Sequence, residues 1–257
     1  MIGEESDMTH SRTDVCVVGG GPAGLLLGLL LAKRGTKVIV LEGHETFDRE
    51  FRGEVLQPST ARLLDEIGLL EYVLGQPHLT LTSGRLLVDG RPAGGFDFRR
   101  IAPEYPYAIW MPQPVFLEAL VRKANPFPGF QCWMGARATE LVEEDGVVVG
   151  VRGRRHGAEP FEVRADVVVG ADGRHSTIRR LGGLVPEYEH HDFDLIWFVV
   201  DPPSDWPRTI YCPVVQYRHT SPGGWGHADQ CETRFEDGAR GPLPGAPHGA
   251  DQIAGHP

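Results

Sequence analysis

The sequence predicts an α/β fold built on a parallel sheet, and three consecutive segments near the N-terminus predict it. An apolar, β-rich run at 15–18 has the pattern of a strand that is buried on both faces. Residues 23–34 are rich in Leu and Ala and are followed by Gly35, as in a helix with a glycine cap. Residues 37–41 form a second apolar run. Strand, helix and strand in this order make a right-handed parallel unit.

Further elements follow along the chain. We expect helices over 58–67 and 114–124 and the start of another at 176–181. Strands are expected over 79–88, 138–143, 147–152, 161–164 and 195–200, and a buried strand over 165–170. The turn signals Asp145-Gly146 and Gly157 predict an antiparallel meander. The Gly-, Pro- and aromatic-rich stretch 91–107 is expected to form strands and loops over a ligand.

Composition and charge exclude several functions. With 25 basic and 35 acidic residues the net charge is −10, which disfavours nucleic acid as a partner. The four cysteines include no CxxC pair, so we expect neither a zinc site nor a disulfide framework, and a cytoplasmic protein. His190-His191 is interpreted as a solvated loop rather than a metal site. Glycines interrupt the apolar run 15–32, which excludes a membrane span.

The glycines between the first strand and helix have the spacing Gly19-x-Gly21-x-x-Gly24. This spacing permits a tight turn, a close approach of a pyrophosphate to the backbone, and close packing of helix on sheet. A pyrophosphate would then meet the N–H groups and dipole of the helix that begins at Ala23, and Pro22 directly before it is expected to lie beside the same group. Glu42, which directly follows the second strand, is placed to accept both ribose hydroxyls of an adenosine. The alternative is a plain glycine-rich turn.

Three more segments carry a resemblance to a known family. They are 168–179 with Asp172-Gly173 and Ser176-x-x-Arg179, 51–54 with Arg52, and 111–113 with Gln113. Together with the glycine motif they resemble the FAD-dependent aromatic hydroxylase superfamily, the group A flavoprotein monooxygenases related to p-hydroxybenzoate hydroxylase. The likeness extends from Asp14 to about residue 180, is looser to residue 211, and is absent beyond residue 212.

The resemblance implies roles for these residues. Asp172, Gly173, Arg174 and Ser176 would form a second fingerprint that presents a carboxylate and free N–H groups to the sugar-phosphate of FAD. In the family an arginine at the position of Arg52 and a glutamine at that of Gln113 lie against the cofactor. The alternatives are a simple β-turn at Asp172-Gly173, surface arginines, and a glutamine that only begins a helix.

The resemblance also implies an activity and a domain organisation. NADH or NADPH would reduce FAD, dioxygen would add at flavin C4a, and the hydroperoxide would hydroxylate an aromatic or polyketide-like small molecule. No catalytic residue is identified, and a homodimer is compatible with this reading. A Rossmann-like FAD-binding domain would comprise 12–78 and 108–182. An inserted antiparallel β-sheet substrate domain, here incomplete, would comprise 79–107 and 183–212.

The C-terminal part departs from the family. The family carries a third motif, Gly-Asp followed by Pro, that contacts the flavin, and the sequence lacks it. Gly and Pro make up 14 of the 45 residues from 213 to 257, a composition typical of disorder. We therefore expect 213–257 to be disordered, or the product of a frameshift or premature ending. A truncated nucleotide-binding remnant without turnover is one alternative function. A halogenase or dehydrogenase on the same scaffold is another, although the halogenase Trp-x-Trp-x-x-Pro signature is absent.

Overall fold

The computed structural model describes residues 8–48, 55–88, 91–187, 189 and 210–214. The chain divides into two compact units, one of Met1–Thr80 and Tyr107–Trp206, the other of Leu81–Pro106 and Pro207–Pro257. Several expectations fall outside the described residues. These are Arg52, His190-His191, the strand at 195–200 and almost all of the tail after residue 212.

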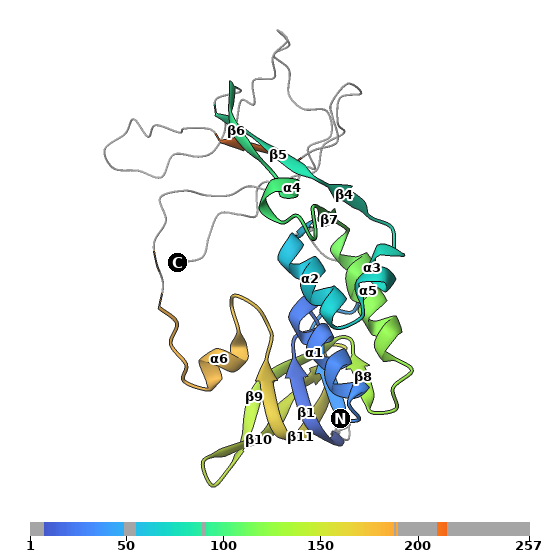
Figure 1. The fold of residues 1–257 in the computed structure, drawn as a ribbon. Helices are drawn as coiled ribbons and strands as arrows, with labels where there is room; N and C mark the ends of the chain where they lie inside the picture. Colours follow the sequence, from blue (N-terminus) through green and yellow to red (C-terminus); the bar gives the residue numbers. More distant parts are fainter. Residues whose placement is uncertain (1–7, 49–54, 89–90, 188, 190–209, 215–257) are drawn as a thin grey trace, which may run out of the picture. The chain divides into compact units, whose positions relative to one another are not determined.

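The first unit is built on a six-stranded sheet with the order β8-β2-β1-β11-β10-β9 (Figure 1). Its strands are β1 (Thr9–Val18), β2 (Val38–Leu41), β8 (Phe130–Trp133), β9 (Ala136–Glu144), β10 (Val147–Arg155) and β11 (Glu159–Gly170). The four strands β8, β2, β1 and β11 are parallel, whereas β9 and β10 extend the sheet antiparallel. The predicted β-α-β unit and the meander are both confirmed, with Asp145 and Gly146 at φ 51° and 77° in the turn.

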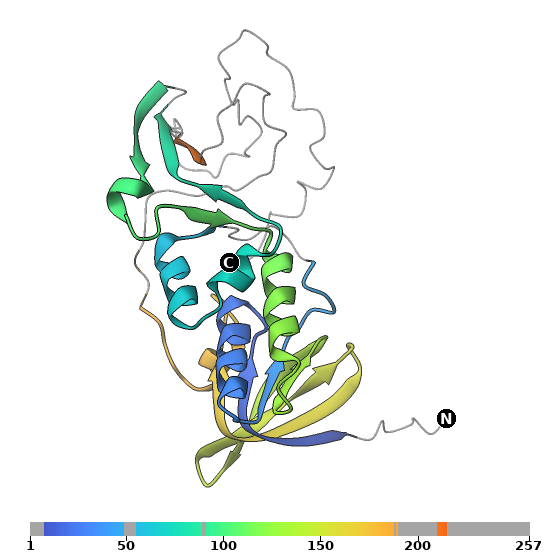
Figure 2. The same ribbon diagram turned by 45° about the vertical axis from the view of Figure 1, so that its right-hand side comes forward.

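Helix α1 (Pro22–Lys33) follows β1 directly and packs on β2, with α5 (Gln113–Ala124) beside it (Figure 2). A Cβ at Gly28 would lie 2.7 Å from Val40 Cγ2, so this glycine lets the helix lie close to the sheet. The helix ends before Gly35, whose φ of 84° suits a glycine cap. Within the described residues, no helix is long and apolar enough to cross a membrane.

The other face of the sheet holds the core around Cys16, Leu41, Phe161 and Ile178. Trp133 packs edge-to-face on Phe161, with ring centroids 5.8 Å apart. Burial raises the pKa of Cys16 to about 12 and is the largest cause that raises that of Cys132 to about 11. Neither thiol is therefore a nucleophile near neutral pH.

The stretch 165–170 corrects one expectation. It is not a separate buried strand but the continuation of β11, and Val167 is 52% exposed. The pairing of β11 with β10 ends at Gly150 and Arg164, whereas the pairing with β1 continues to Gly170. Beyond Arg164 the strand thus has a described neighbour on one side, which leaves part of its apolar run exposed.

The remaining elements of the first unit are short. They are β3 (Val55–Leu56), α2 (Pro58–Glu66), α3 (Leu70–Leu74), β7 (Ala108–Trp110) and α6 (Thr177–Leu181). Strand β4 (Leu79–Leu81), in which the first unit ends at Thr80, belongs with β3 and β7 to a sheet of order β3-β7-β4. The expected strand 79–88 is thus divided between β4 and β5 (Ser83–Val88). Helix α2 matches its prediction, with Pro58 at its first turn and Gly68 at φ 72° past its end.

The second unit contains an antiparallel hairpin of β5 (Ser83–Val88) and β6 (Arg91–Asp97), followed by helix α4 (Phe98–Ile101). Strand β12 (Ile210–Val214) pairs with β5 in parallel. The substrate-domain sheet was expected to be antiparallel, but it is mixed, because β12 is parallel to β5.

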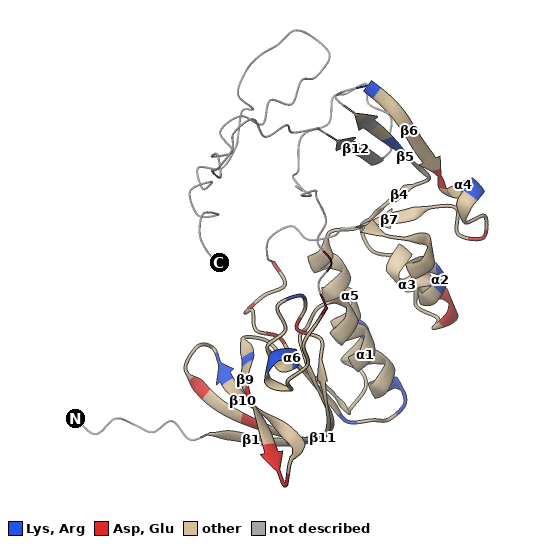
Figure 3. Cartoon of the chain, turned by 90° about the vertical axis from the view of Figure 1, so that its left-hand side faces the viewer, with Lys and Arg blue, Asp and Glu red and all other residues tan. Residues whose placement is uncertain are grey.

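A charged cluster lies on β9, β10 and β11, whose acidic and basic residues are red and blue in Figure 3. Glu162 is buried and accepts hydrogen bonds from Arg152 Nε and Arg164 Nε, both at 2.6 Å. Arg164 also pairs with Glu144. The hydrogen bond from Arg164 is the largest cause that lowers the pKa of Glu162 below its ordinary value of 4.5.

We expect Glu162→Gln to destabilise the first unit at neutral pH by about 1–2 kcal/mol, a value reduced because both arginines are partly exposed. A lowered pKa makes this stability fully present above the ordinary pKa, and it is lost as pH falls through the folded-state pKa. Thermal unfolding of both proteins between pH 7 and pH 3 should therefore show a difference that shrinks in acid. Glu159→Gln, at an exposed position of the same strand, is the control. A constant difference at all pH values would contradict the assignment.

Candidate functional site

Three strand ends meet at one edge of the parallel sheet. Val18 of β1 lies in register with Leu41 of β2 and with Gly170 of β11. The next residues stay together, because Gly19 N donates to Leu41 O at 2.8 Å and Ala171 N donates to Val18 O at 2.7 Å. In doubly wound sheets the carboxyl edge of the strands is where ligands bind.

The three glycines of the motif have different physical reasons to be glycine. At Gly19, with φ 111°, a Cβ would lie 2.3 Å from Ala171 O, and at Gly24 it would lie 1.9 Å from Gly19 O. These two positions are closed by the protein's own backbone. At Gly21 a Cβ would meet no atom of the residues that the structure describes within 4 Å. The missing side chain at Gly21 therefore leaves open space at the start of α1.

The first turn of α1 faces this space without a side-chain cap. Gly21 is the N-cap in an extended conformation, Pro22 occupies the first turn, and no side-chain cap hydrogen bond is made there within the described part of the chain. Pro22 and Ala23 are exposed and the first turn contains no acidic residue. First-turn N–H groups have no partner within their helix, and the dipole there is positive. Open space beside such a turn fits a phosphate group.

Glu42 follows β2 and is only 3% exposed. Its Oε2 accepts a hydrogen bond from Gly20 N at 2.9 Å, and its Oε1 accepts from His44 N at 2.9 Å. The His44 ring also contacts Oε1, through Nδ1 at 2.7 Å. The carboxylate is thus fixed next to the glycine loop. Gly20 and His44 were missed by the sequence reasoning, and the only signal for them is their position inside the motif and two residues after the acid.

Asp172 corrects a second expectation. Its carboxylate accepts hydrogen bonds from Ser176 Oγ, from Thr177 N at 2.6 Å and from Ile178 N at 3.1 Å. Ser176 Oγ in turn accepts from Arg179 N at 3.0 Å. The first-turn N–H groups of α6, expected to be free for a sugar-phosphate, are therefore occupied by Asp172 and Ser176. A short polar side chain before a helix caps it more readily than it leaves its N–H groups open.

The other sequence candidates are placed as follows. Gly173 has φ 83° in the turn before α6, and Arg174 is exposed there, with its carbonyl accepting from Arg179 Nη2 at 2.7 Å. Gln113 is half-buried at the start of α5, the helix that packs beside α1. The structure thus brings together the glycine loop, Glu42 and the Asp172 turn.

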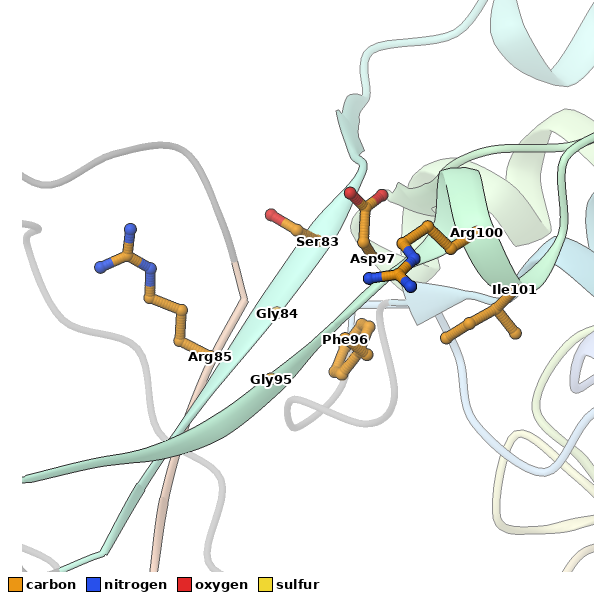
Figure 4. A pocket seen from close by; sticks show the side chains of 8 residues that line it. All are labelled: Ser83, Gly84, Arg85, Gly95, Phe96, Asp97, Arg100 and Ile101. Carbon is orange, nitrogen blue, oxygen red and sulfur yellow. The ribbon is translucent and has the colours of Figure 1, made fainter.

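The second unit has a hollow of about 470 Å³ of its own (Figure 4). The ring of Phe96 lies over Gly84, where a Cβ would approach the ring to 2.3 Å. Arg85 and Arg100 lie at opposite ends of the hollow in Figure 4. Asp97 is held by Arg99, with Nη2 2.6 Å from Oδ2, and this hydrogen bond is the main cause that lowers its pKa. The hollow therefore combines an apolar surface with two basic side chains and one carboxylate, which is paired with Arg99.

Comparison with known proteins gives one matching family and several similar enzymes. The family described as FAD binding domain matches residues 12–224. The chain is 42% identical over 201 residues to 6-methylpretetramide 4-monooxygenase of Streptomyces rimosus, covering 78% of the chain and 47% of the relative. It is 33% identical over 187 residues to a 12-dehydrotetracycline 5-monooxygenase/anhydrotetracycline 6-monooxygenase of Streptomyces rimosus subsp. rimosus, covering 72% and 36%.

A solved structure is similar in fold. The p-nitrophenol 4-monooxygenase PnpA of Pseudomonas putida DLL-E4 superposes with a TM-score of 0.60 and 27% sequence identity, over 68% of this chain and 44% of that chain. The chain spans less than half the length of each of these three relatives.

The glycine geometry predicts opposite effects of two substitutions on stability. Gly24→Ala should lower the free energy of unfolding by about 3 kcal/mol, since its Cβ would collide with the Gly19 carbonyl. Gly21→Ser should leave it unchanged or raise it by about 0.5 kcal/mol, because the new side chain enters open space and serine is a good N-cap. Denaturant unfolding of both variants measures this. Equal destabilisation by the two substitutions would contradict the geometry described here, in which Gly24 is enclosed by backbone and Gly21 faces open space.

Proposed function

Because the chain belongs to the FAD-dependent aromatic hydroxylase family, we propose that its first unit binds FAD in a protein that hydroxylates an aromatic or polyketide-like small molecule. One observation carries the proposal. The space left by Gly21 opens onto the uncapped first turn of α1, and a fixed carboxylate, Glu42, stands beside the same loop.

The two parts of this site suit the two parts of an adenosine dinucleotide. The pyrophosphate would lie in the space at Gly21, where it accepts hydrogen bonds from N–H groups of the first turn of α1. The ribose hydroxyls would donate to Glu42, since a carboxylate oxygen accepts more than one hydrogen bond. Such bonds to an ionised acceptor are stronger than neutral ones and fix the orientation of the adenosine.

The Asp172 turn has a supporting role in this proposal. Asp172 and Ser176 cap α6 and hold the turn next to Gly19, where a Cβ would lie 2.7 Å from Asp172 N. They would shape the wall of the cofactor site rather than offer free N–H groups. By family resemblance, Arg52, Gln113, Gly173 and Arg174 would contact the cofactor directly.

The bound flavin, reduced by NADH or NADPH, would supply the reaction with dioxygen at C4a. The protein would bind the flavin and the substrate, orient them and exclude water. We propose 12–78 and 108–182 as the cofactor domain, and 79–107 with 183–212 as the substrate domain of a cytoplasmic enzyme. The relatives named for a pretetramide and for tetracyclines favour a fused-ring polyketide as substrate. The hollow between Arg85 and Arg100 suits a planar ring bearing phenolate or enolate oxygens.

A second candidate is FAD binding without turnover. Oxygen uptake by the FAD-loaded protein with NADH or NADPH separates the two candidates. Uptake that depends on FAD and rises with a fused-ring phenol supports the monooxygenase, whereas FAD binding without uptake supports the second candidate.

For FAD binding itself, titration with FAD followed by flavin fluorescence is the direct measurement. We expect Glu42→Gln to weaken binding about tenfold or more, because hydrogen bonds to a charged acceptor contribute about 1.5–3 kcal/mol. Gly21→Ser should abolish binding while the protein stays folded, since its side chain fills the space that a pyrophosphate needs. Wild-type affinity in Gly21→Ser would refute the cradle.

A further inference from the structure

The carboxylate of Glu42 is held from two sides. Gly20 N donates to Oε2 at 2.9 Å, from the loop between β1 and α1. On Oε1 two groups of a single residue converge, His44 N at 2.9 Å and His44 Nδ1 at 2.7 Å. The Glu42 side chain is 4% exposed, whereas the His44 ring is 52% exposed. The histidine thus lies on the solvent side of an otherwise enclosed acid.

We propose that His44 is a positioning residue for ribose recognition, in that it sets the plane of the Glu42 carboxylate that receives the ribose hydroxyls. The inference rests on the proposed function, because it assigns a task to His44 only if Glu42 binds an adenosine ribose.

The geometry explains why a side-chain partner matters here. A glutamate side chain has three rotatable bonds, and its last torsion is broad, so one hydrogen bond to Oε2 leaves the carboxylate free to turn about that contact. The backbone N–H of His44 supplies one contact on Oε1 at 2.9 Å, and the ring Nδ1 adds a second, shorter one at 2.7 Å that strengthens the hold on the plane. Hydrogen bonds to an ionised acceptor are strong enough for this task. Because a ribose presents two adjacent hydroxyls, its binding is sensitive to that plane.

A second histidine–carboxylate pair on the same loop provides a matched control. His156 Nδ1 lies 2.8 Å from Glu45 Oε2. The two pairs are joined through Gly135, whose N–H donates to His44 O at 2.8 Å and whose carbonyl accepts from His156 N at 3.0 Å. The His156 pair ties the same turns together but does not contact Glu42 in any hydrogen bond described above.

Two substitutions separate the hydrogen bond of His44 from its volume. His44→Asn keeps an amide donor close to the position of Nδ1 but removes most of the ring. His44→Phe keeps a ring of similar size but has no donor. The backbone N–H of residue 44 remains in both, so any difference between them reports on the side-chain contact.

The experiment is calorimetric titration of the full chain and of His44→Asn, His44→Phe and His156→Ala with ADP and with 2′-deoxy-ADP. For wild type, ADP should bind more tightly than 2′-deoxy-ADP. In His44→Phe we expect ADP affinity to fall about tenfold while 2′-deoxy-ADP changes little, so that the preference for the 2′-hydroxyl is lost. His44→Asn should restore most of the preference, and His156→Ala should keep all of it. Thermal unfolding without ligand checks that each variant is folded.

The outcomes distinguish a failure of the role of His44 from a failure of the proposed FAD binding. A wild-type preference that persists unchanged in His44→Phe overturns the role of His44 and leaves FAD binding intact. Equal losses for ADP and 2′-deoxy-ADP, or the same loss in His156→Ala, would also overturn it, since they indicate general loosening of the loop. If the wild-type chain binds neither FAD nor ADP, the proposed function fails and this inference fails with it.

Discussion

The close approach of three backbone segments at one sheet edge is the constraint on which the site depends. The Gly19 carbonyl lies where a Cβ of Gly24 would be, and Gly19 itself lies against the Ala171 carbonyl. Only residues without side chains allow the β1–α1 turn to be this tight and the turn after β11 to reach it. As a result, the start of α1, the acid after β2 and the Asp172 turn are neighbours in space although far apart in the chain.

Two helix starts at this edge satisfy their N–H groups in opposite ways. Helix α6 is closed by its own side chains, because Asp172 and Ser176 accept its first-turn N–H groups. Helix α1 begins at a glycine and carries no side-chain cap. An uncapped helix start is unfavourable unless water or a ligand accepts those bonds, so one helix is stabilised from within and the other is left open to an anion from outside. The N-cap residue determines the difference: Gly21 has no side chain to cap α1, whereas Ser176 caps α6.

The local sequence pattern was sufficient to predict β1, α1, β2 and the glycine loop, because apolar periodicity and glycine spacing depend only on residues close together in the chain. The local pattern failed where a contact between distant elements determines the structure. Val167 is 52% exposed and lies beyond the point where β10 stops pairing with β11, and no residue near 167 encodes that end point. The capping by Asp172 was misread because the same Asp-Gly turn can serve a ligand or a helix. The contact between Gly20 and Glu42 spans 22 residues, and only the fold brings the two together.

In the proposed complex the buried Glu42 carboxylate would lie close to a negatively charged pyrophosphate, and neighbouring N–H groups offset the repulsion. The chain carries a net charge of −10, and an adenosine dinucleotide brings a charged pyrophosphate close to a buried carboxylate. Like charges in a poorly solvated site repel more strongly than in water, so the acid needs compensation. The N–H groups of Gly20 and His44 and the His44 ring place positive ends of dipoles on both carboxylate oxygens. The uncapped end of α1 does the same for the phosphate. In the proposed complex these dipoles would let a carboxylate and a pyrophosphate lie side by side in an acidic protein, although the glycine loop contains no lysine or arginine.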